Sequence, residues 1–134
     1  MLIFIFLCQS SINNANQPLT MQKGVAVILL FLGEALAIYA ELYAAKKNVS
    51  LFDKELFLKM FLLMAVAGGA LIAGYMVGYK LFSNVWIVIA LSIGAIVVIE
   101  PAIAYFLFKE LPTKGAMIGL VLGVVGMLSS AFIK

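Results

Sequence analysis

Hydrophobic residues along the chain form four long runs that are separated by short polar segments. The runs cover about residues 24–45, 56–79, 85–108 and 115–133. Each holds about 19 to 24 residues, which as an α-helix is long enough to cross a hydrocarbon layer roughly 30 Å thick. The pattern therefore predicts an all-α membrane protein, a four-transmembrane-helix bundle.

The polar segments between the runs are short, at about residues 46–55, 80–84 and 109–114. Connections of this length place consecutive helices side by side and antiparallel, and they leave no room for a domain outside the membrane. We therefore expect the function to lie within the bilayer.

Residues 1–20 form an N-terminal extension that differs from the rest. A short apolar stretch ending at Cys8 is followed by a polar segment rich in asparagine. The apolar stretch is too short to span a membrane, and it lacks the basic region and cleavage site of a signal peptide. Since Met21 directly precedes the first run, the extension is either not native or a mobile or interfacial segment. The transmembrane domain is expected over residues 21–134.

The composition agrees with a membrane protein, because 66% of the residues are hydrophobic and only 11% are charged. Soluble domains carry roughly 25% charged residues, so a water-soluble enzyme is excluded. The chain has no histidine, its basic residues are all lysine, and Cys8 is its one cysteine. We therefore expect no enzymatic activity, no cofactor, no metal site and no nucleic-acid partner.

Most of the nine lysines flank the apolar runs. This placement indicates contact with membrane lipids and a multi-pass protein of the cell membrane. The side that holds the first and third loops carries more lysines than the side that holds the termini. This bias favours termini that face outward, although insertion in both orientations remains an alternative. The lysines of the richer side are Lys46, Lys47, Lys54, Lys59, Lys109 and Lys114.

Four ionisable residues, Glu34, Glu41, Lys59 and Glu100, lie within the apolar runs. Each is a functional candidate, since an ionisable group in a span costs a few kcal/mol to insert. Glu34 is near the centre of the first run. Burial favours its neutral form, so we expect it to bind a proton and a cationic substrate in alternation. The alternative is a hydrogen bond between helices.

Glu41 follows Glu34 by seven residues, which places both carboxylates within about 20° of one another around the helix. Lys59 enters the second run from the same side of the membrane as Glu41. The spacing predicts an ion pair between Glu41 and Lys59.

Glu100 and Tyr75 are further candidates for the substrate and proton site. Glu100 precedes Pro101, which offers no N–H to the carbonyl of Val97, so a kink or a small polar pocket is expected there. A hydrogen bond that satisfies this kink is an equal alternative for Glu100. Tyr75 is suited to lining a cation path, although packing explains it equally well.

Small residues form a stripe along the fourth run, within about 80° around the helix. Glycine lets membrane helices approach closely, so the stripe predicts helix packing, either within the bundle or between subunits of a dimer. Its members are Gly115, Gly119, Gly123 and Gly126.

Two segments resemble the small multidrug resistance proteins of the drug/metabolite transporter superfamily. One runs from Gly33-Glu34 to the lysines that end the first run. The other is residues 106–113, Phe-Leu-Phe-Lys-Glu-Leu-Pro-Thr, which lead into the glycine stripe. The resemblance covers about residues 21–134. It implies a homodimer, with Glu34 binding protons and a small cationic substrate competitively. The aromatic cluster of the family's third helix is not reproduced, so a metabolite, a lipid-linked sugar or a guanidinium-like compound are alternative substrates.

Two hypotheses follow from these features. The first is a proton-coupled exporter of small cationic or amphipathic compounds with alternating access around Glu34. The alternative is a membrane accessory or assembly subunit, such as part of a lipid-linked sugar flippase, in which the glutamates contact a partner protein.

Overall fold

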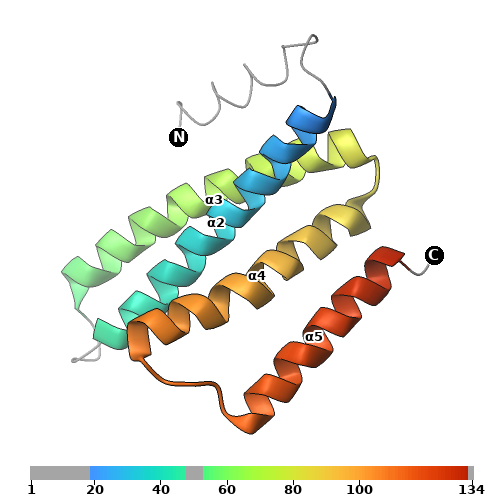
Figure 1. Ribbon diagram of the computed structural model, residues 1–134. Helices are drawn as coiled ribbons and strands as arrows, with labels where there is room; N and C mark the ends of the chain where they lie inside the picture. The colour runs from blue at the N-terminus through green and yellow to red at the C-terminus, as the bar shows by residue number, and fades with distance from the viewer. Residues whose placement is uncertain (1–18, 48–52, 133–134) are drawn as a thin grey trace.

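A computed structural model describes residues 19–47 and 53–132, and over this part of the chain every element is an α-helix. The helices are α2 (Leu19–Lys47), α3 (Lys54–Phe82), α4 (Val85–Phe108) and α5 (Lys114–Phe132), as Figure 1 shows. The expected four-helix, all-α fold is confirmed. The extension expected at residues 1–20 lies outside the described residues, except for the first two residues of α2.

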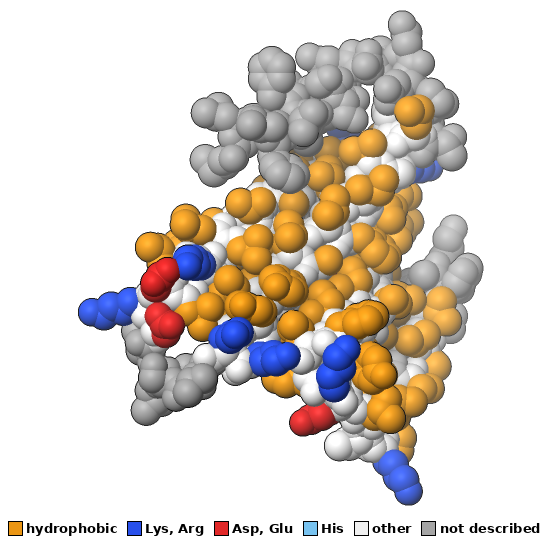
Figure 2. Space-filling model, turned by 60° about the vertical axis from the view of Figure 1, so that its left-hand side comes forward, with side chains coloured by type: hydrophobic (Ala, Val, Ile, Leu, Met, Phe, Trp, Pro, Cys, Tyr) orange, Lys and Arg blue, Asp and Glu red, His pale blue; other side chains and the backbone are white. Residues whose placement is uncertain are grey.

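Three of these helices, α2, α3 and α4, are long and apolar enough to cross a membrane. The chain is therefore a membrane protein. Figure 2 shows hydrophobic side chains across the middle of the visible face, with lysine and acidic side chains along its lower edge. This distribution is typical of a protein whose apolar side chains face lipid, since water-soluble proteins rarely expose such large apolar areas.

Short polar residues cap the starts of α3 and α4. The side chain of Asp53 accepts hydrogen bonds from the backbone N–H groups of Glu55 (3.0 Å) and Leu56 (3.2 Å) at the start of α3. Asn84 accepts from Trp86 N–H (2.9 Å) at the start of α4. Ser83 ends α3 in the left-handed conformation (φ 52°). This residue and Asn84 therefore suffice to reverse the chain, which places α3 and α4 antiparallel.

The core of the bundle is the pair α2 and α3, the most extensive helix contact in the described part of the chain. At two levels, a leucine of one helix packs against a glycine of the other. A Cβ at Gly74 would lie 3.0 Å from Leu30 Cγ, and a Cβ at Gly33 would lie 2.7 Å from Leu71 Cγ. Each glycine therefore accepts the leucine of the opposite helix, and both backbones approach closely.

Helix α4 packs mainly against α2, and α5 packs mainly against α4 at the edge of the bundle (Figure 1). The contact between α4 and α5 includes Gly123, where a Cβ would lie 3.7 Å from Val97 Cγ2. At the other stripe positions, Gly115, Gly119 and Gly126, a Cβ would meet nothing within 4 Å in the described structure. Among the described residues, Gly123 is therefore the one position of the predicted stripe where α5 packs against another helix.

Candidate functional site

Glu34 lies at mid-length in α2 and is only 9% exposed. Its direction follows from the residue before it, since Gly33 is held against Leu71 of α3. Successive residues on an α-helix are rotated by about 100°, so position 34 is turned to one side of the contact with α3 when position 33 faces α3. The glycine contact therefore turns the Glu34 carboxylate toward α4.

The partner of Glu34 is Ser92 on α4, whose hydroxyl donates a hydrogen bond to Glu34 Oε1. Ser92 is 4% exposed, and these two are the only buried polar side chains in the described part of the chain. A buried polar group without a hydrogen bond costs several kcal/mol in an apolar medium. The bond therefore satisfies both groups, and it joins α2 to α4 at mid-length in α2.

Small residues surround this level of the bundle. In the register set by Leu30 against Gly74 and Gly33 against Leu71, Ala70 of α3 lies level with Glu34, and it is fully buried. Ala95, one turn after Ser92 on α4, is also fully buried.

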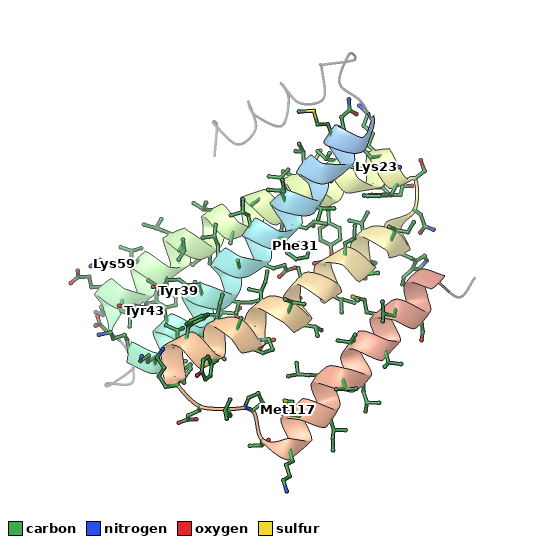
Figure 3. The ribbon with its side chains drawn as sticks, in the orientation of Figure 1. Lys23, Phe31, Tyr39, Tyr43, Lys59 and Met117 are labelled. Atoms are coloured by element: carbon green, nitrogen blue, oxygen red, sulfur yellow. The ribbon has the colours of Figure 1, made fainter. Side chains whose placement is uncertain are left out.

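The predicted ion pair between Glu41 and Lys59 is wrong. Lys59 pairs with Glu55, one turn earlier on α3, at 2.6 Å between Nζ and Oε1. Figure 3 shows Lys59 on the outer side of α3. Residues four apart on a helix are neighbours without any help from another helix, so the local partner is preferred. Glu41 itself is exposed.

The side chain of Glu100 is exposed, and α4 continues through Pro101 to Phe108. The kink or small polar pocket expected beside Pro101 stays a prediction. Glu100 also follows Ser92 by eight residues, which is about 12 Å along the helix. The structure thus separates Glu100 from the Glu34 site.

The remaining candidate, Tyr75, is half-buried on α3. It is five residues from Ala70, so it lies about 7.5 Å along the bundle from the level of Glu34. The structure places Ser92, rather than Tyr75, against the carboxylate. Tyr39 and Tyr43, labelled in Figure 3, stack on one another at 5.5 Å between ring centroids and form no box around Glu34.

Ser92 was missed by the sequence interpretation. The signal was a lone serine in the first third of the most apolar run. Whether this serine can reach Glu34 depends on which faces of α2 and α4 meet. The hydrophobic pattern does not specify these faces, because nearly every residue of the two helices is apolar.

One further polar contact ties α2 to α4 at the lysine-rich end. The ammonium group of Lys46 donates a hydrogen bond to the backbone carbonyl of Leu107, in the last turn of α4. Carbonyls in the last turn of a helix lack backbone partners and attract cations. Lys46 therefore caps α4 from the neighbouring helix and holds the ends of α2 and α4 together.

No protein-family model, curated protein or solved structure matches the chain. Within the part of the chain that the structure describes, no three His, Cys, Asp or Glu side chains are grouped so that they could hold a metal ion. The buried pair of Glu34 and Ser92 is therefore the candidate functional site of the chain.

Proposed function

We propose that the chain is a proton-coupled exporter of small cationic or amphipathic compounds in the cell membrane. The observation that supports the proposal is the burial of the Glu34 carboxylate at mid-length in α2, with a single hydroxyl as its polar partner. A purely structural hydrogen bond does not require a carboxyl group at this depth, where the charged form is expensive to maintain.

The carboxylate is chemically suited to exchange. Two carboxylate oxygens offer about four sites for hydrogen-bond donors, and the Ser92 hydroxyl occupies one of them. The negative charge is then neutralised by a proton or by the cation to be transported. Because both compete for one group, release of a proton accompanies binding of the cation, and the reverse step completes the cycle.

Transport also requires that Glu34 reach both sides of the membrane in turn. In the present structure it is closed off, at 9% exposure. We propose that a homodimer alternates between two states in which α4 moves relative to the tight pair of α2 and α3. The open glycine positions 115, 119 and 126 of α5 suit close packing against a second copy.

The transport test uses proteoliposomes with a pH gradient and two probe cations, guanidinium and tetraphenylphosphonium. We expect the unaltered protein to move at least one of them against the proton gradient and Glu34→Gln to move neither. Glu41→Gln is the matched control, since Glu41 lies on the same stripe of α2 but is exposed. Transport by Glu34→Gln at the unaltered rate would overturn the proposal.

A second candidate is favoured by one observation, the exposure of Glu100 within the apolar part of α4. An exposed carboxylate in a span calls for a partner, which suits an accessory or assembly subunit, such as part of a lipid-linked sugar flippase. Purification separates the two candidates. A stable dimer of this chain alone supports the exporter, whereas a monomer that is stable only with another membrane protein supports the accessory subunit.

A further inference from the structure

Two serines within the described helices use their hydroxyl groups differently. Ser129 donates to the carbonyl of Val125, four residues earlier on its own helix, at 2.8 Å. This bond is open to a serine in any α-helix, because the carbonyl four residues back is always within reach. Ser92 instead donates to Glu34 on another helix.

Ser92 has a local acceptor equivalent to the one that Ser129 uses. The carbonyl four residues earlier belongs to Val88, and a carbonyl that already accepts a helix N–H has a second lone pair for a hydroxyl. Val88 is fully buried, and its side chain packs on Gly78 of α3, where a Cβ would lie 3.1 Å from Val88 Cγ1. The alternative acceptor for Ser92 is therefore held in place by the contact between α3 and α4.

We propose that Ser92 is a positioning residue that latches Glu34 and releases it when the cation binds. In the latched state, which is the present structure, the Ser92 hydroxyl donates a hydrogen bond to Glu34 Oε1 and so holds α2 to α4. In the released state, the hydroxyl turns to the Val88 carbonyl, and both oxygens of Glu34 accept the cation. This proposal rests on the exchange role of Glu34 proposed above.

The exchange of acceptors keeps every buried group satisfied. Ser92 and Glu34 are the only buried polar side chains in the described structure, so no third side chain in this region competes for either of them. When the hydroxyl leaves Glu34, it gains a carbonyl, and the carboxylate gains the cation. One hydrogen bond replaces another of similar strength, so the latch opens without leaving an unpaired polar group.

The test measures the rate at which dicyclohexylcarbodiimide, an apolar carboxyl reagent, modifies Glu34 in the purified protein, with mass spectrometry of the peptide that contains it. We expect Ser92→Ala to increase this rate about twofold to tenfold, the factor that corresponds to the net strength of one hydrogen bond. Ser92→Thr keeps the hydroxyl and is expected to restore the unaltered rate. Ser129→Ala, which removes a hydroxyl bonded within its own helix, is the matched control and is expected to change nothing.

Equal rates for Ser92→Ala and the unaltered protein would overturn the latch, as would an equal increase in Ser129→Ala. If Ser92→Ala does not fold, Ser92→Cys serves in its place, since a thiol is a weaker donor and an intermediate increase is expected. Protection of Glu34 by guanidinium or tetraphenylphosphonium is measured in parallel on the unaltered protein. Absence of protection by either probe contradicts the exchange role, whereas protection combined with an unchanged Ser92→Ala rate contradicts the latch alone.

Discussion

Gly33 of α2 and Leu71 of α3 are in such close contact that a Cβ at position 33 would lie 2.7 Å from Leu71 Cγ and 3.1 Å from the Leu71 backbone nitrogen. The contact with the backbone nitrogen matters most, because a side chain turns away more easily than a helix moves. This contact fixes the rotation of α2, and the rotation directs Glu34 toward Ser92. The packing of the two best-packed helices thus determines the geometry of the candidate site.

Gly33→Ala is therefore expected to destabilise the protein by about 1–3 kcal/mol, the usual cost of an added methyl group in a packed interface. Thermal unfolding in detergent measures the effect. Gly69→Ala on α3 is the control, because a Cβ there would meet nothing within 4 Å. It is expected to be neutral or to stabilise the helix by about 0.5–1 kcal/mol. Equal effects of the two substitutions would contradict the close contact.

The bond from Lys46 to the Leu107 carbonyl predicts a difference between adjacent lysines. Lys46→Gln should lower the free energy of unfolding by about 0.5–1.5 kcal/mol, since a charged donor is removed from the last turn of α4. Lys47→Gln should have little effect, because Lys47 is equally exposed and forms no such bond to α4 in the described structure. Unfolding of both variants in the same detergent checks the prediction, which fails if the two lysines contribute equally.

A double-mutant cycle distinguishes the observed ion pair from the one expected from sequence. Glu55→Gln and Lys59→Met should show a small favourable coupling, as exposed pairs four residues apart on a helix do. Glu41→Gln and Lys59→Met should be additive, because Lys59 pairs with Glu55. Coupling with Glu41 and none with Glu55 would show that the interhelical pair forms in the membrane.

Substitutions at the glycines of α5 distinguish packing within the chain from packing between two chains. Gly123→Leu should weaken the contact of α5 with α4, because Gly123 faces Val97. Gly119→Leu should leave the fold intact and reduce self-association, because position 119 is open. Chemical cross-linking in vesicles measures the dimer, and circular dichroism measures the fold. A Gly119→Leu protein that still forms the full amount of dimer would exclude this part of α5 from the interface.

Helices α2, α3 and α4 could be predicted from the sequence because their length and apolarity suffice to define a membrane span. The importance of Glu34 could also be predicted, since a carboxylate at mid-span is costly wherever its helix faces. The pairing with Ser92 could not, because it depends on the rotation of α2 that Gly33 and Leu71 set. Lys59 was assigned to Glu41 because both enter their helices from the same side of the membrane, whereas in the structure it pairs with Glu55, one turn earlier on its own helix.

The most direct test of the central claim measures protons released when a cation binds. The purified protein is mixed with guanidinium chloride or tetraphenylphosphonium chloride in weakly buffered detergent near neutral pH, and the pH change is followed. We expect the unaltered protein and Glu41→Gln to release protons in proportion to the cation bound, and Glu34→Gln to release none. Proton release by Glu34→Gln equal to that of the unaltered protein would contradict the assignment of Glu34 as the group that exchanges a proton for a cation.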